Sequence, residues 1–396
     1  MTSRNESAWR QQPSFPETYV VSGLVYHDDN VFALERETIF NKAWILACHE
    51  SELPEKFDFR TLEIADTPLI VVRGADASLR AFINVCSHRG ARLVNERSGN
   101  AKAFTCFYHR WTYDTKGSCI NIPRPEGYQA CGVHTGDYGL REVRTEVKLG
   151  LVFLNLDDNA CPLDDFLGGA LDPLKEILGG VPLEVFHYQR SEIDANWKAW
   201  METNLDTYHT GMHYLLRKTQ VDKQRRIRIV AGGHGNTGGM KSAYTNYADW
   251  KNREDSMALP GADAREMRNA HLFPNASVIT RGTVVRIDTV SPIGPHRTVV
   301  ECRGLGIKGD TEDERRQRVE HHNQYWGPLG RNLPEDGLAA ELCARSYRSG
   351  SAHYQVIARD EGLTGQDDGM LRAYYAQWSK MTGLSLSDPR AVTRER

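Results

Sequence analysis

Residues 42–160 contain short apolar runs that end at turn residues, as in 67–73 and 149–156. Runs of this length, rich in branched aliphatic residues, favour β-strands over helices. Between two further runs, residues 113–117 have the composition of a hairpin turn. The pattern therefore predicts a small all-β domain over residues 42–160.

The segments that flank this domain have a different pattern. Residues 276–290 and 297–303 alternate apolar and polar side chains, as antiparallel strands do. An antiparallel sheet with helices predicts an α+β domain, formed by residues 1–41 and 161–396. Its helices are expected where apolar residues recur at helical spacing, at 29–40, 162–179, 192–216, 315–325 and 368–381. The aromatic side chains of the last of these are expected in its core.

Composition narrows the class of protein. The 396 residues are 40% hydrophobic and 26% charged, with a net charge of −3, which is typical of a globular protein with two domains. The near-neutral charge predicts no nucleic-acid partner. No run approaches the roughly 18 apolar residues of a membrane span. The polar N-terminus lacks the core of a signal peptide, so we expect a cytoplasmic protein.

Two pairs of cysteine and histidine stand close together in the predicted β-domain: Cys86 with His88, and Cys106 with His109. Two thiolates and two imidazoles are the ligand set of a Rieske [2Fe–2S] cluster. A structural zinc site is the alternative, but its paired ligands usually leave two to four residues between them, whereas Cys86 and His88 leave one. The other six cysteines show no paired spacing and are expected to be free thiols.

A second group of candidate ligands follows in the next domain. Asp206, His209 and His213 are three and four residues apart, so on the helix expected at 192–216 they would share one face. Two histidines and one carboxylate form the facial triad of non-haem Fe(II) oxygenases. In contrast, His321 and His322 lie in a charged helical run and are expected to be solvated.

Residues 84–92 and 106–111 resemble the Rieske domain of ring-hydroxylating oxygenase large (alpha) subunits. Residues 206–213 match the Asp-x-x-His motif of that family, and 326–337 resemble its Gly-Pro-x-Gly…Asp-Gly segment. By this match, Asp336 is the carboxylate ligand of the mononuclear iron. Competing carboxylates are Glu335 and, more remotely, Asp360, Asp367 and Asp368.

The resemblance implies that the α+β domain is of the helix-grip type, and it implies a role for each motif. It implies that a [2Fe–2S] cluster is held by Cys86, His88, Cys106 and His109, and a mononuclear Fe(II) by His209, His213 and Asp336. It also implies a trimer in which Asp206 joins His109 of one chain to His209 of the next. A carboxylate between two imidazoles would fix their tautomers and orientation.

The resemblance further implies a terminal oxygenase that hydroxylates an aromatic ring with O2. Overall order and length are most like the enzymes for aromatic carboxylic acids such as salicylate, terephthalate and anthranilate. Electrons would come from NAD(P)H through a separate reductase or ferredoxin, and the trimer would form with or without a small beta subunit. Alternatives are an uncharged aromatic substrate, a monooxygenase or demethylase reaction, and a non-catalytic electron-transfer protein.

Two further segments bear on this reading. Residues 231–239 contain Gly-x-Gly-x-x-Gly, but the residues that follow do not read as the helix a dinucleotide-binding fold requires. We expect a flexible loop near the mouth of the active site instead. The cationic stretch 217–226 offers candidates for one buried Arg or Lys that would bind a carboxylate. Most of its charges are expected on a solvated face or a ferredoxin-docking patch.

Overall fold

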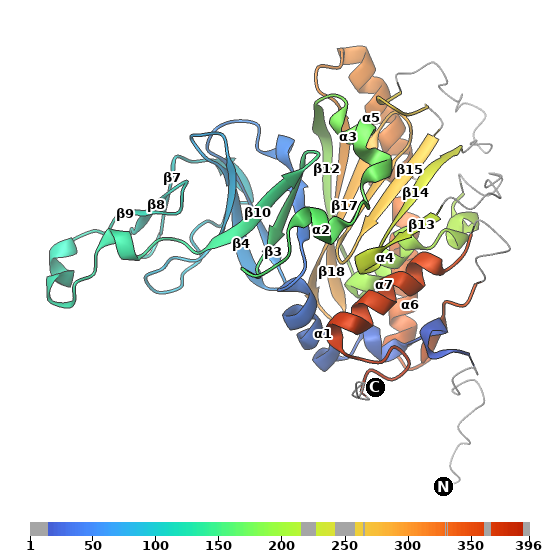
Figure 1. The fold of residues 1–396 in the computed structure, drawn as a ribbon. Coiled ribbons are helices and arrows are strands. Elements are labelled where there is room, and N and C mark those ends of the chain that lie inside the picture. Colours follow the sequence, from blue (N-terminus) through green and yellow to red (C-terminus); the bar gives the residue numbers. More distant parts are fainter. Residues whose placement is uncertain are drawn as a thin grey trace, which may run out of the picture. The chain divides into compact units, whose positions relative to one another are not determined.

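The computed structural model describes residues 15–214, 227–241, 258–263, 266–328, 330, 332–359 and 366–390. The chain divides into two compact units (Figure 1). The smaller unit is Phe40–Leu163, and the larger one combines Met1–Ile39 with Asp164–Arg396. In the described ranges, no helix has the length and apolar character needed to cross a membrane.

The smaller unit is built of antiparallel strands, as the sequence predicts. One sheet has the order β2-β11-β10-β5-β4-β3-β6, and a three-stranded sheet has the order β7-β8-β9. The strands are β2 Ile45–His49, β3 Asp58–Ile64, β4 Thr67–Arg73, β5 Leu79–Ile83, β6 Ser98–Asn100, β7 Ala103–Thr105, β8 Thr112–Asp114, β9 Cys119–Asn121, β10 Glu142–Lys148 and β11 Leu151–Asn155. The predicted hairpin turn lies between β8 and β9, where Gly117 has a φ of +81°.

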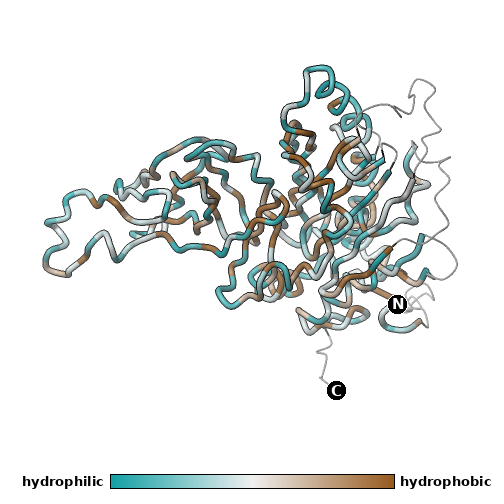
Figure 2. Tube along the Cα trace, turned by 45° about the horizontal axis from the view of Figure 1, so that its top comes forward, coloured by the Kyte–Doolittle hydropathy of each residue, from teal (hydrophilic) through white to brown (hydrophobic). Residues whose placement is uncertain are grey.

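The core of the smaller unit lies directly under the candidate cluster ligands. Phe59, Phe82 and Phe104 pack in one cluster with the buried Cys86 and Cys106. Figure 2 shows hydrophobic stretches along the strands of both units and hydrophilic residues on many of the connecting loops. The two cysteines are therefore held at the edge of a packed core rather than on free loops.

The larger unit is an antiparallel seven-stranded sheet with helices, which confirms the predicted α+β class. Its sheet has the order β12-β18-β17-β16-β15-β14-β13. The strands are β12 Leu183–Ile193, β13 Ile227–Val230, β14 His234–Lys241, β15 Glu266–Leu272, β16 Ala276–Thr280, β17 Val285–Gly294 and β18 Arg297–Ile307; β1 Val20–Ser22 pairs separately with β19 Tyr354–Val356. The helices are α1 Asp29–Glu35, α2 Leu163–Leu167, α3 Lys175–Gly179, α4 Trp197–Leu205, α5 Glu312–Trp326, α6 Leu333–Arg348 and α7 Gly369–Thr382.

Helices α4, α5 and α7 cover the same face of this sheet. Asn204 of α4 bonds to Asp288 of β17, and the ring of His322 in α5 lies over Gly304 of β18. Residues that pair across adjacent strands lie on the same face of a sheet. Through these pairings, Asp288 and Gly304 lie on the face that carries His271. On α7, the predicted aromatic core stripe is confirmed, because Tyr374, Tyr375 and Trp378 are all buried.

A buried ion pair anchors the first turn of α4. Glu35 and Lys198 are completely buried, and their side chains are 2.5 Å apart. Glu35 also accepts hydrogen bonds from the indole N–H groups of Trp197 and Trp378, at 2.9 and 2.6 Å. A buried charge pair requires such additional bonds to offset its desolvation. The pair therefore ties α4 to α1 and α7 at a fixed height above the sheet.

Three sequence-based expectations about this unit are wrong in whole or in part. Residues 192–216 do not form one helix, because β12 extends to Ile193 and α4 ends at Leu205. The glycine-rich segment is only in part a loop: Ala231–Gly233 form the turn after β13, but residues from His234 onward form β14, which pairs with β13 and β15. His322 is not solvated: Gly304 lets its ring approach the sheet, and burial lowers its pKa to about 3.

Candidate metal centres

Two loops of the smaller unit place the Cys and His pairs with the same backbone hydrogen bonds. The amide of Cys86 donates to the carbonyl of Ala91, and the amide of Cys106 donates to that of Trp111, both at 2.8 Å. The amides of Gly90 and Arg110 return to the two cysteine carbonyls at 3.0 Å. Both of these residues have positive φ, which closes each loop tightly.

The four candidate cluster ligands converge at these loops. The rings of His88 and His109 are 4.6 Å apart, and Trp111 stacks on His88 at 4.7 Å. Nδ1 of His88 is buried and has no hydrogen-bond partner among the described residues. Burial, with a further contribution from Cys86, raises the pKa of the Cys106 thiol. Two buried thiols and an unpartnered imidazole nitrogen form a donor set that fits an iron–sulfur cluster.

The second group of ligands begins where α4 ends. Asp206 follows the last helical residue, and its Oδ1 accepts the amide hydrogen of Tyr208 at 2.6 Å. Such a side-chain bond competes with the helix and starts a turn instead. His209 then lies on a short 3-10 turn, Tyr208–Met212, and His213 is extended. The two histidines are therefore positioned by a turn rather than by one helix face.

His209, His213 and Asp336 come together in space, although Asp336 is on α6. The Nε2 atoms of the two histidines are 3.1 Å apart. Oδ1 of Asp336 is 3.5 Å from Nε2 of His209 and 3.3 Å from Nε2 of His213. Ligand atoms that bind one ion at about 2.1 Å and at right angles are about 3 Å apart, so this triangle fits a facial triad.

Each histidine of the triad has a second carboxylate at its other ring nitrogen. Nδ1 of His213 is 2.8 Å from Glu335, and Nδ1 of His209 is 3.5 Å from Asp206. A carboxylate in this position fixes the tautomer and leaves Nε2 free to bind a metal. Glu335, which the sequence left open as an alternative metal ligand, therefore contacts Nδ1 of His213 rather than Nε2. The carboxylates of Asp367 and Asp368 accept other backbone amides, and Asp360 lies outside the described residues.

The charges around the triad favour a bound cation. Burial disfavours the charged form of His209, but Asp206 and Asp336 outweigh it and raise its pKa to about 10. Oδ1 of Asp336 is buried and accepts no hydrogen bond from the described residues. The carboxylates that stabilise a proton on His209 would also stabilise a metal dication, and binding of the metal would release that proton. The donor set and its orphaned oxygen therefore fit mononuclear Fe(II).

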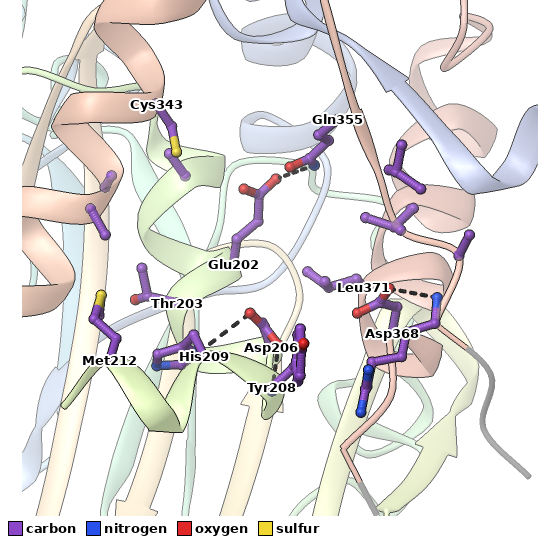
Figure 3. Close-up of a pocket in the computed structure, with 17 residues that line it drawn as sticks. Glu202, Thr203, Asp206, Tyr208, His209, Met212, Cys343, Gln355, Asp368 and Leu371 are labelled. Carbon is purple, nitrogen blue, oxygen red and sulfur yellow. Dashed lines mark hydrogen bonds and ion pairs between the residues drawn. The ribbon is translucent and has the colours of Figure 1, made fainter. Parts of the chain in front are cut away.

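A cavity of about 520 Å³ lies on the Asp206 side of His209 (Figure 3). Glu202, Asp206 and Asp368 line it together with apolar residues of α6 and the segment 355–358. Oε1 of Glu202 accepts hydrogen bonds from Tyr26, Tyr375 and Gln355. Burial raises the pKa of Glu202 despite these donors. The last turn of α4 is thus held from this side by three different segments.

Sequence reasoning missed the buried polar groups on the sheet face under α4. Arg286 and Asp288 form an ion pair there, and both bond to Asn204. The signal in the sequence was a charged residue at two alternate positions, 286 and 288, of the mostly apolar segment 284–290. The cationic stretch 217–226, to which the sequence drew attention, lies outside the described residues.

Comparison with known proteins agrees with both centres. Residues 43–141 match the model of the Rieske [2Fe–2S] domain, and residues 182–381 match the catalytic domain of ring-hydroxylating alpha subunits. The chain is 44% identical to the alpha subunit of 2-aminobenzenesulfonate 2,3-dioxygenase from an Alcaligenes species, over 96% of this chain and 98% of that one.

More distant relatives extend the comparison. The methanesulfonate monooxygenase hydroxylase alpha subunit of Methylosulfonomonas methylovora is 39% identical, over 98% and 97% of the two chains. An anthranilate 1,2-dioxygenase large subunit of Burkholderia cepacia is 27% identical, over 91% and 92%. A naphthalene 1,2-dioxygenase structure has the same fold, with a TM-score of 0.80 at 24% identity over 96% of each chain.

The two halves of the chain therefore match the two parts of one known architecture, in the same order and over nearly the full length. The resemblance noted in the sequence is confirmed. The chain belongs to the Rieske-type ring-hydroxylating oxygenases, as an alpha subunit with a [2Fe–2S] domain and a non-haem iron catalytic domain.

Proposed function

We propose that this chain is the terminal oxygenase of a multicomponent system and hydroxylates an organic acid with O2. The triangle of His209, His213 and Asp336 carries this proposal, because it presents three metal ligands on one side of a common point. When bound, the cluster supplies electrons one at a time, and Fe(II) supplies coordination positions open to O2 and substrate. A separate reductase or ferredoxin would deliver the electrons.

The residues of the chain would act by holding these groups. Cys86, His88, Cys106 and His109 would hold the cluster at two loops of equal geometry. Glu335 accepts the Nδ1 proton of His213, which keeps Nε2 of that ring available to a metal. The Asp206 carboxylate lies 3.5 Å from Nδ1 of His209, where its negative charge favours a proton on that nitrogen. In a homotrimer, Asp206 would also meet His109 of a neighbouring copy and couple the two centres.

Replacing Asp206 with asparagine is expected to slow turnover by about 10- to 100-fold or more, while both kinds of iron stay bound. Asparagine keeps an oxygen for the amide of Tyr208 but removes the charge next to His209. The measurement is product formed per trimer with reductase and NAD(P)H, alongside iron content and the visible spectrum. Asp368→Asn changes another carboxylate of the same cavity and should leave turnover near normal.

A mixed trimer tests whether electrons cross between copies. Trimers of Cys86→Ala alone would be inactive because they lack a cluster, and trimers of Asp206→Asn alone would be strongly slowed because they lack the coupling carboxylate. Co-expressed in one trimer, they should regain part of the activity, because an intact cluster would face an intact Asp206. Full inactivity of the mixed trimers would contradict transfer between subunits.

The anionic group of the substrate is proposed to be a sulfonate. The sequence predicts an aromatic carboxylic acid, and the anthranilate relative supports that class at 27% identity. The relatives at 44% and 39% identity are both named for sulfonates. We therefore place an aromatic sulfonate first and an aromatic carboxylate second.

Turnover of three matched compounds tests this proposal. 2-Aminobenzenesulfonate, 2-aminobenzoate and aniline share a ring and an amine and differ in the anionic group. We expect hydroxylation coupled to NAD(P)H consumption in the order sulfonate, carboxylate, aniline. Preferred turnover of aniline or of an uncharged polycyclic ring, with both acids inert, would contradict the organic-acid assignment.

A further inference from the structure

The sheet face beneath α4 has an unusually polar floor, made of Asn269, His271, Ser277, Arg286 and Asp288. These five side chains share one face because His271 pairs with Ser277 and Ser277 with Asp288 across adjacent strands, and the other two follow at a spacing of two residues. All are at least nine-tenths buried. Interiors seldom bury so many polar groups without a use for them.

Arg286 is fixed within this floor by three partners. Its Nε donates to Asp288 at 2.9 Å, and its Nη2 donates to Asp288 and, at 2.7 Å, to Asn204 of α4. The guanidinium also lies 5.2 Å from the ring centre of Trp326. An arginine held in this way is pre-oriented and loses little side-chain entropy when it binds a further group.

Two nitrogens of the floor keep a free hydrogen-bonding position. Nη1 of Arg286 has no hydrogen-bond partner among the described residues, and neither has Nε2 of His271, whose Nδ1 is 2.9 Å from Ser277. Oδ1 of the neighbouring Asn269 is also buried without a partner in the described ranges. A buried polar atom such as Oδ1 of Asn269 is costly to leave open unless a ligand or water satisfies it.

The protonation states of Arg286 and His271 make both of them possible donors to an anionic group. Burial disfavours the charged form of Arg286. The negative charges of Asp288 and, to a smaller extent, Asp336 outweigh this effect and raise the pKa of Arg286. Burial, with Arg286 nearby, lowers the pKa of His271 to about 3, so its ring is neutral. The open nitrogen of Arg286 therefore belongs to a cation, and Nε2 of His271 is a neutral N–H donor when Ser277 donates to Nδ1.

We propose that Arg286, with His271 beside it, is the subsite that recognises the anionic group of the substrate. The sulfonate or carboxylate oxygens accept from Nη1 of Arg286 and, when Ser277 donates to Nδ1 of His271, from Nε2 of that ring. A polar donor on the substrate can satisfy Asn269. This inference deepens the proposed function and rests on its claim that the substrate is an organic acid.

Binding without turnover tests the subsite. Anaerobic calorimetry on the holoenzyme would compare 2-aminobenzenesulfonate, 2-aminobenzoate and aniline. Arg286→Lys keeps the charge opposite Asp288 but loses the planar fork. We expect it to weaken binding of both anions by about ten- to a hundredfold, the range of one charge-assisted hydrogen bond, and to leave aniline unchanged. A double variant, Arg286→Gln with Asp288→Asn, removes both charges without leaving either unpaired and should give the same pattern.

Arg303 provides a matched control. It is also buried, pairs with an acid two residues away and lies over an aromatic ring, that of Tyr188. It is on the opposite face, since it pairs in register with Ile287, between Arg286 and Asp288. Arg303→Lys should leave the affinity for all three compounds unchanged.

Each outcome separates the subsite from the proposed function. Unchanged anion affinity in both Arg286 variants, or an equal loss of affinity for aniline, would overturn the subsite. The proposed function would still stand if the wild-type enzyme hydroxylated the acids. Wild-type enzyme that neither binds nor hydroxylates either acid would overturn the organic-acid assignment itself. Visible spectrum and iron content would establish that each variant is assembled.

Discussion

Replacing Asp336 with alanine is expected to release the mononuclear iron and abolish hydroxylation, while the cluster spectrum persists. Asp336 is the one carboxylate whose oxygen approaches Nε2 of both His209 and His213 in the described structure. Two neutral imidazoles alone leave the charge of the dication uncompensated and bind it weakly. The loss of iron affinity should exceed the roughly 10- to 100-fold that removal of an outer carboxylate causes.

The neighbouring acid provides the control for this variant. Glu335→Gln removes the carboxylate at Nδ1 of His213 but leaves the three candidate ligands in place. We expect it to keep the iron with reduced affinity and to retain measurable turnover. Iron analysis after gel filtration would compare the two variants. Retention of iron by Asp336→Ala together with its loss from Glu335→Gln would assign the ligand to Glu335 instead.

Replacing Cys86 with alanine is expected to remove the whole visible spectrum of the cluster and all activity with the natural reductant. A [2Fe–2S] cluster with three protein ligands has lost one of the two thiolates on one iron. The mononuclear site belongs to the other compact unit, so its iron should remain. Absorption before and after dithionite, with iron and sulfide analysis, gives the measurement.

Cys119→Ala is the matched control for this change. Cys119 is buried in the same core cluster as Cys86 but is a free thiol outside the two ligand loops. Its removal should leave the spectrum unchanged. A colourless wild-type protein that contains zinc, or a full spectrum in Cys86→Ala, would contradict the cluster assignment.

Features that depend on neighbours in sequence could be read from the sequence. The strand 67–73 agrees with β4, and the hairpin at 113–117 is present, because alternation and turn residues act over a few positions. The loops that carry Cys86 and Cys106 close through bonds between residues four and five apart. Short-range spacing alone therefore indicated the cluster motif.

The sequence failed where a local competitor or a distant partner decided the outcome. The periodicity of 192–216 predicts a continuous helix, but the side chain of Asp206 captures the amide of Tyr208 and ends it. The glycines of 231–239 suggest a loop, but only Ala231–Gly233 form a turn, and pairing with β13 and β15 makes the rest of the segment a strand. Neither effect has a period that a hydrophobic pattern could reveal.

The sequence by itself indicated the chain's family and its two kinds of iron centre, and it predicted the histidines of each, because these residues lie in short motifs. Only the tertiary structure brought Asp336 to the two histidines, since they are far apart in the chain and α6 must pack beside α4 before they meet. The same holds for Arg286, whose charge is buried beneath α4 and held by Asn204 and Asp288. Long-range packing decides which polar groups share a site; the sequence named Asp336 only through a family resemblance and gave no sign of Arg286.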